Sequence, residues 1–207
     1  MSQIILIIFE LIGTVAFAVS GALTAIRQKM DVFGIVTLGI ITAVGGGVIR
    51  DLVLGNTPPE TFKNPIYAVV AIITSAVVFI YFSKNKLVSI HKSTDIILLI
   101  MDSLGLAVFT VSGIETAVSV TKGFNIFLLL FVGIITGTGG GVVRDVLAKN
   151  TPYIFIKHFY ATASLIGAVL CIILWNCCGK IPAMIAGAVV IFVLRILAAK
   201  YHWKLPK

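Results

Sequence analysis

The sequence predicts an all-helical protein that crosses a membrane seven times and is built from an inverted repeat. Of its 207 residues, 59% are hydrophobic, against roughly 45–50% in soluble domains, and the mean hydropathy is +1.12. Seven apolar stretches approach the roughly 20 residues that a membrane-spanning helix needs. One of these stretches, marked by three consecutive glycines, occurs a second time further along the chain.

The seven spans follow one another through short connections. We expect them at residues 4–26, 32–54, 65–82, 95–120, 125–147, 159–175 and 181–199. The connections leave no room for a soluble domain, so the sequence predicts one membrane domain over residues 1–207. The first span resembles a secretory signal, but no basic segment precedes it and Glu10 interrupts it, so we expect it to be retained.

The second and fifth spans contain the two copies of the glycine-rich stretch. Residues 39–58 read GIITAVGGGVIRDLVLGNTP, and residues 133–152 read GIITGTGGGVVRDVLAKNTP. The first and fourth spans also match, through FAVSG at residues 17–21 and FTVSG at residues 109–113. We therefore place repeat one at about residues 1–83, repeat two at about 94–176 and an extra helix at about 180–200. Because each repeat crosses the membrane three times, the second must enter from the opposite side.

The basic residues predict the orientation. Ten lie on one side of the predicted topology: Arg27, Lys29, Lys84, Lys86, Lys92, Lys149, Lys157, Lys200, Lys204 and Lys207. Three lie on the other: Lys63, Lys122 and Lys180. The positive-inside rule then leaves the N-terminus outside and the C-terminus in the cytoplasm. The net charge of +8 is thus a topology signal and not a nucleic-acid surface, which would show a basic patch with interleaved aromatics.

The glycine triplets are the first candidate functional feature. Each glycine lowers helix propensity by about 1 kcal/mol relative to alanine, so we expect the second and fifth helices to be broken there. The freed carbonyl groups must face protein or water, where they could coordinate a cation. The alternative is that the glycines only let helices pack closely. The predicted path residues are Thr42, Gly45, Gly46, Gly47, Thr136, Gly139, Gly140 and Gly141.

Charges within or beside the spans are the second candidate feature, because a charge at the membrane centre costs at least about 2.5–3.5 kcal/mol. They are Glu10, Arg50, Asp51, Asp102, Glu115, Arg144, Asp145 and Arg195. Counting residues from the span ends puts Glu10 at the depth of Arg50, near the outer side. The same count puts Asp102 at the depth of Arg144, near the inner side. We therefore predict one ion pair at each end of a central path, acting either as a static lock or as a gate.

Two further expectations concern the remaining charges. Arg195 lies near the inner level and could approach Asp102 or Asp145. Sequence neighbours point about 100° apart on a helix, so we expect Arg50 not to pair with Asp51.

Other residues indicate structure more than chemistry. The NTP sequences at residues 56–58 and 150–152 are turn signals that end the glycine-bearing helices. Small residues around Ser20 and Ser112 favour close packing of the first and fourth spans, although their hydroxyls could line a path. The cysteines match no metal-ligand spacing, and no nucleophile–base set or nucleotide motif is present. We expect no enzyme, no cofactor, no bound metal, and no nucleic-acid or soluble partner.

The doubled GGGVxRD sequence with its trailing NTP, the FxVSG sequence of spans one and four, and the order of the seven spans resemble prokaryotic members of the trimeric intracellular cation channel (TRIC) family. The resemblance covers nearly the whole chain. It implies a homotrimer in the inner membrane of a prokaryote, with a pore in each protomer around the second and fifth helices. The permeant ion would be potassium or sodium, chiefly potassium. The lipid bilayer and further copies of the chain are the expected partners.

The resemblance also leaves an alternative. The same sequence domain has carried the label of a glycine transporter, and inverted repeats with broken helices serve secondary transporters as well. A transporter of a small neutral solute such as glycine is therefore the second hypothesis, and a non-conducting scaffold is the third. Animal members of the family bind phosphoinositides through a lysine-containing motif in one repeat. This chain has three glycines in both repeats, so that lipid site is not expected here.

Overall fold

The computed structural model describes residues 2–84, 92–121, 125–156 and 159–203. Within these residues the chain forms nine helices and no strand. They are α1 Ser2–Arg27, α2 Val32–Val53, α3 Glu60–Lys63, α4 Ile66–Lys84, α5 Lys92–Val120, α6 Ile126–Leu147, α7 Tyr153–Ile156, α8 Ala161–Cys178 and α9 Lys180–Lys200. Seven of these described helices, all but the four-residue α3 and α7, are long and apolar enough to cross a membrane. The predicted seven spans are confirmed.

Capping residues explain where the glycine-bearing helices begin and end. The side chains of Asp31 and Asn125 each accept a hydrogen bond from a backbone N–H three residues later, at 2.7 and 3.2 Å, and so cap α2 and α6. At the other ends, Gly55 with φ of 71° follows α2 and Lys149 with φ of 55° follows α6. This left-handed conformation is common where helices end, and the two residues are equivalent positions of the repeat.

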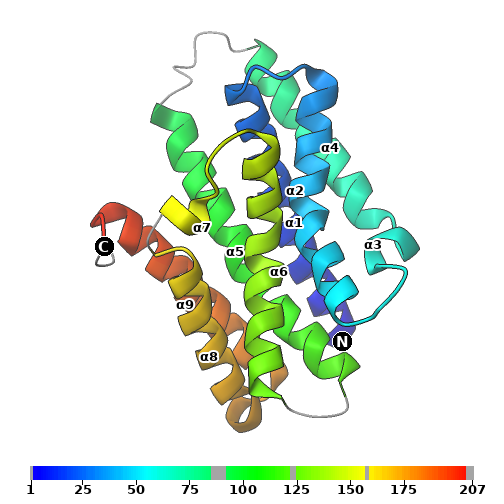
Figure 1. Ribbon diagram of the computed structural model, residues 1–207, viewed down its shortest axis with the longest axis vertical. Coiled ribbons are helices and arrows are strands. Elements are labelled where there is room, and N and C mark those ends of the chain that lie inside the picture. Colours follow the sequence, from blue (N-terminus) through cyan, green and yellow to red (C-terminus); the bar gives the residue numbers. More distant parts are fainter. Residues whose placement is uncertain (1, 85–91, 122–124, 157–158, 204–207) are drawn as a thin grey trace.

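Corresponding helices of the two repeats run in opposite directions (Figure 1). α1 rises from the N-terminus to the top of the view, whereas α5 descends, and α2 and α6 are opposed in the same way. α1 packs on α2 and α5, and α2 packs on α6. These four helices form the centre of the bundle. The extra helix α9 packs on α5 and α8.

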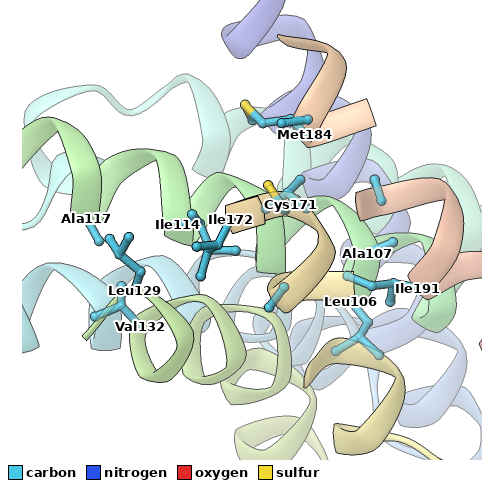
Figure 2. Close-up of a cluster of buried hydrophobic side chains, with 14 of the residues drawn as sticks. Leu106, Ala107, Ile114, Ala117, Leu129, Val132, Cys171, Ile172, Met184 and Ile191 are labelled. Carbon is cyan, nitrogen blue, oxygen red and sulfur yellow. The ribbon is translucent and has the colours of Figure 1, made fainter. Parts of the chain in front are cut away.

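The largest apolar core joins the second repeat to α9. Figure 2 shows its side chains, which come from α5, α6, α8 and α9 and include Leu106, Ala107, Ile114, Ala117, Leu129, Val132, Cys171, Ile172, Met184 and Ile191. The first repeat differs, because of the 19 residues of α4 only Ala71 and Ser75 are buried. Its apolar surface suits contact with lipid or with another subunit.

The glycine triplets do not break their helices, and this part of the prediction is wrong. α2 and α6 run as continuous α-helices through both triplets. Within a membrane each unmade backbone hydrogen bond costs several kcal/mol. That cost exceeds the propensity penalty of about 1 kcal/mol per glycine, so the helical hydrogen bonds are kept and the glycines serve another purpose.

Candidate functional site

The two glycine triplets lie against each other where α2 crosses α6. A Cβ atom at Gly46 would collide with the carbonyl oxygen of Thr136, and a Cβ atom at Gly140 would collide with that of Thr42. A Cβ atom at Gly45 would lie 3.7 Å from the Cα of Gly140. The structure therefore brings the predicted path residues together, as a direct contact between two backbones that only glycine permits.

The two predicted path threonines are turned away from this contact. The hydroxyls of Thr42 and Thr136 donate to carbonyl oxygens four residues earlier in their own helices, at 2.6 Å in both cases. A Cβ atom at Gly21 would meet the Thr42 hydroxyl, and one at Gly113 would meet the Thr136 hydroxyl. Both threonines thus pack against α1 and α5, through the glycines of the FxVSG sequences.

The outer ion pair between Glu10 and Arg50 is present. Arg50 Nη1 lies 3.6 Å from Glu10 Oε1. Glu10 also accepts hydrogen bonds from the hydroxyls of Tyr67 and Ser112, at 2.6 and 2.7 Å. The carboxylate of Glu10 therefore links α1 to α2, α4 and α5. We call Glu10, Arg50, Asp51, Tyr67 and Ser112 the outer cluster.

The inner ion pair between Asp102 and Arg144 is also present, and both side chains are 0% exposed. Arg144 Nη1 donates to Asp102 and to the hydroxyl of Ser20, which lies 3.5 Å from Asp102 Oδ1. Ser20 and Ser112 are equivalent in the repeat, so each repeat supplies a serine to the carboxylate of the other. In both halves a carboxylate residue precedes a serine by ten residues. This spacing is the sequence signal that would have revealed the contact between each serine and the carboxylate of the other repeat.

Each arginine also pairs with the aspartate that follows it, contrary to the prediction for Arg50. Arg50 Nε lies 2.8 Å from Asp51 Oδ1, and Arg144 Nε lies 2.8 Å from Asp145 Oδ1. The Cβ atoms of helix neighbours diverge by about 100°. The arginine side chain is long and flexible enough to bend back across this angle.

The second oxygens of these aspartates hold the short helices that follow the NTP turns. Asp51 Oδ2 accepts the backbone N–H of Glu60 at 2.8 Å, at the start of α3. Asp145 Oδ2 accepts the N–H of Tyr153 at 3.0 Å, at the start of α7. The two turns were predicted from the sequence, whereas the two short helices were not. Each Arg-Asp couple is therefore also a structural anchor for the loop beyond its helix.

Two aromatic rings lie between the outer cluster and the inner cluster, by which we mean Ser20, Asp102, Arg144 and Asp145. Phe17 and Phe109 occupy the same position in the two FxVSG sequences, and their ring centroids are 5.3 Å apart. The Phe17 ring packs on Gly105 and would lie 3.3 Å from a Cβ atom at Gly140. In the sequence these two residues indicate only the repeat, and the structure adds them to the candidate site.

A cavity of about 30 Å³ opens at the outer cluster. Its lining comprises Glu10, Thr14, Ala43, Val44, Gly47, Arg50, Glu60, Thr61, Tyr67 and Phe109. A cavity of this size holds about one water molecule. It reaches the glycine crossing at Gly47 and the aromatic pair at Phe109.

Cationic and aromatic groups alternate at the inner cluster. Arg144 Cζ lies 5.1 Å from the ring centroid of Tyr153, Arg195 Cζ lies 4.7 Å from that of Tyr160, and the two tyrosine rings are 6.4 Å apart. A Cβ atom at Gly141 would lie 3.0 Å from the Tyr160 hydroxyl. Burial raises the pKa of Tyr153 above its usual value, so this phenol stays neutral.

Arg195 lies near the inner ion pairs, on the ring of Tyr160, but does not join them. In the described part of the chain, no ion pair connects it to Asp102 or Asp145. The ring of Tyr160 takes the place of a carboxylate beside it. The remaining membrane charge, Glu115, pairs with Lys180 on the side predicted to face outward.

Sequence comparison places most of the chain in one group of membrane proteins. A family described as glycine transporter matches residues 7–83 and 99–176. The UPF0126 inner membrane protein YadS of Escherichia coli strain K12 is 37% identical over 200 residues, which cover 95% of this chain and 93% of that protein. The UPF0126 membrane protein YvgT of Bacillus subtilis strain 168 is 32% identical over 199 residues, which cover 96% and 94%.

Solved structures with the same fold are cation channels by description. A prokaryotic TRIC channel crystallised in 0.5 M KCl is similar with a TM-score of 0.89 and 35% identity, over 98% of this chain and 100% of that one. The TRIC orthologue from Rhodobacter sphaeroides is similar with a TM-score of 0.87 and 34% identity, over 96% and 99%. The similarity thus extends along the whole chain.

Proposed function

Because this chain belongs to the trimeric intracellular cation channel family, as a prokaryotic member, we propose that it is a passive channel for monovalent cations, chiefly potassium, with one path inside each protomer. The path runs along the crossing of α2 and α6, between the outer and inner clusters. The backbone contact at the glycines and the Phe17–Phe109 pair support a closed state of this path.

The observation that carries the proposal is the charge balance at the two ends. Arg50 and Arg144 would repel cations if they were unpaired. In the structure each of these two arginines is shared by two carboxylates, so each set of one cation and two anions has a net formal charge of −1. The sets are Glu10–Arg50–Asp51 and Asp102–Arg144–Asp145. The outer set forms a negative entrance, which raises the local concentration of cations and disfavours anions, whereas at the inner end Arg195 adds a positive charge beside the set, across the Tyr160 ring.

The proposal includes an orientation and an assembly. We place the N-terminus outside, the C-terminus in the cytoplasm, and three copies together in the inner membrane of a prokaryote. Support comes from the relatives named inner membrane proteins and from the exposed apolar face of α4. Five basic residues that bear on the orientation lie outside the described residues: Lys86, Lys122, Lys157, Lys204 and Lys207.

A secondary transporter of glycine is the alternative that the family description suggests. The structural relatives are described as channels, so the proposal includes no enzymatic step. It also includes no cofactor beyond the permeant potassium or sodium ion.

Flux through liposomes tests the proposal. Purified protein in vesicles with a potassium gradient should pass potassium passively, at rates too high for one conformational cycle per ion. A transporter should instead accumulate labelled glycine, saturate, and respond to a sodium or proton gradient. Vesicles that are silent to potassium and show saturable glycine uptake would overturn the channel assignment.

A further inference from the structure

A second cavity lies beside the proposed path, at the ends of α5, α7 and α9 that face the predicted cytoplasmic side. Its volume is about 390 Å³, more than ten times that of the outer cavity. Leu98, Ile156 and Phe159 give it apolar walls. The cavity is therefore large enough for a small organic group or a lipid headgroup, and its walls suit an amphipathic molecule.

Arg195, on the wall of this cavity, has a charge that the described protein does not balance. Its side chain is 2% exposed, and its Nε and Nη2 atoms have no hydrogen-bond partner among the residues that the structure describes. Within the described ranges it forms no ion pair, and the ring of Tyr160 covers one face of the guanidinium. A buried cation without an anion is strongly unfavourable. An anionic partner is therefore needed to balance the charge of this guanidinium.

The carboxylate on the same wall does not meet this need. Asp95 lies 2.7 Å from Arg27, and its side chain is 66% exposed, so its charge is already balanced at the rim. His202 also lines the cavity, and its ring can donate a hydrogen bond. The cavity is thus electropositive at Arg195.

The proposed ion path does not use this charge. α9 lies outside the repeat, so Arg195 has no equivalent in repeat one. The four ion pairs of the outer and inner clusters form without it, and Asp102 Oδ2 has no hydrogen-bond partner in the described part of the chain. A site at Arg195 would therefore stand whether or not the protein conducts ions.

We propose that this cavity binds a phosphate-bearing anion, with the phosphate held by Arg195. A guanidinium offers two parallel N–H donors that match two phosphate oxygens. Inorganic phosphate and the headgroup of an anionic phospholipid share this chemistry. The apolar walls and Trp203 at the rim fit the phospholipid, because tryptophan is typical of the membrane interface.

Thermal unfolding of the purified protein in neutral detergent tests this site. Three additions are compared: phosphatidylglycerol, neutral phosphatidylcholine, and inorganic phosphate. We expect phosphatidylglycerol to raise the unfolding temperature by several degrees in the unmodified protein and not in Arg195→Gln. A shift with inorganic phosphate that also requires Arg195 would identify the free anion as sufficient. No Arg195-dependent shift with either anion would overturn the proposal.

Two further variants keep the test decisive if Arg195→Gln does not fold. Ala199→Trp fills the cavity from its wall while it retains the arginine, and it should also abolish the shift. Lys84→Gln removes an exposed charge at the end of α4 and should keep the shift. A site in this cavity would be contradicted if the shift survived in Ala199→Trp, or if Lys84→Gln lost the shift as fully as Arg195→Gln. Either result would indicate general attraction of anionic lipid to the protein. Neither readout involves ion flux, so failure here leaves the channel assignment untouched.

Discussion

The rings of Phe17 and Phe109 meet at the centre of the bundle with their centroids 5.3 Å apart. Along α1, Phe17 lies between Glu10 of the outer cluster and Ser20 of the inner cluster, and Phe109 has the equivalent place on α5. The pair therefore forms an apolar segment between two polar ones. Hydrophobic constrictions of this kind close channels because water and hydrated ions do not enter them readily.

Truncation of this segment should increase conduction. We expect Phe109→Ala to raise passive potassium flux several-fold in liposomes, because the smaller side chain opens the outer cavity toward the inner cluster. Phe127→Ala is the matched control, since Phe127 is 77% exposed on the outside of α6, and its flux should equal that of the unmodified protein. Equal flux in Phe109→Ala and the unmodified protein would show that the aromatic pair is not the barrier.

Adjacent glycines should differ sharply in their tolerance of alanine. A Cβ atom at Gly46 would collide with the backbone of Thr136, whereas at Gly47 the nearest atom would be Arg50 Nη2 at 3.9 Å. We expect Gly46→Ala to lower stability by about 1–3 kcal/mol or more through overpacking, and Gly47→Ala to change it little. The midpoint of unfolding in mixed micelles with increasing SDS measures both. Similar midpoints would contradict the close crossing of α2 and α6.

The predictions from sequence were correct for ion pairs that depend only on the depth of the two residues in the membrane. A helix rises by a fixed 1.5 Å per residue, so counting from span ends was enough to match Glu10 with Arg50 and Asp102 with Arg144. The same regularity gave the seven spans. Nothing beyond the sequence of apolar stretches and the inverted repeat was needed.

The predictions failed where the surroundings of a residue decide its conformation. Glycine propensity is measured in water, but the glycine-bearing helices keep their hydrogen bonds because the membrane offers no substitute. The roles of Ser20 and Tyr160 depend on how α1 and α9 cross the helices beside them, which no single-helix pattern encodes. The pairing of Arg50 with Asp51 depends on the side-chain conformation of a long residue, which Cβ directions do not determine.

Loss of the inner arginine should be far more damaging than loss of the outer one. Arg144→Gln leaves Asp102 and Asp145 buried without a counter-ion, which costs about 3–5 kcal/mol. Arg50→Gln should cost less, because Glu10 is 22% exposed and keeps its hydrogen bonds from two hydroxyls. Unfolding in SDS-containing micelles compares the two. Adding Asp102→Asn to Arg144→Gln should restore part of the loss, and failure of this rescue would argue against uncompensated charge as the cause.

The outer pair can be tested as a gate. If the Glu10–Arg50 pair restrains α1 against α2, Arg50→Ala should raise potassium flux in protein that still elutes as an intact assembly. Arg50→Lys keeps a cation and should behave more like the unmodified protein. Unchanged flux in a correctly assembled Arg50→Ala variant would reduce the pair to a static lock between helices.

The ends of the two glycine-bearing helices offer a matched test of backbone strain. Gly55 and Lys149 hold equivalent positions with φ of 71° and 55°, a conformation that costs a residue with a side chain about 1–2 kcal/mol and glycine almost nothing. Lys149→Gly should therefore stabilise the protein. The expected gain is up to about 1 kcal/mol, because the larger conformational entropy of glycine in the unfolded chain offsets part of the relieved strain. Gly55→Lys should destabilise it by a similar amount. Lys149→Ala removes the charge but keeps the strain, so it should show no such gain. If alanine stabilised the protein as much as glycine, relief of charge repulsion and not of backbone strain would be the cause.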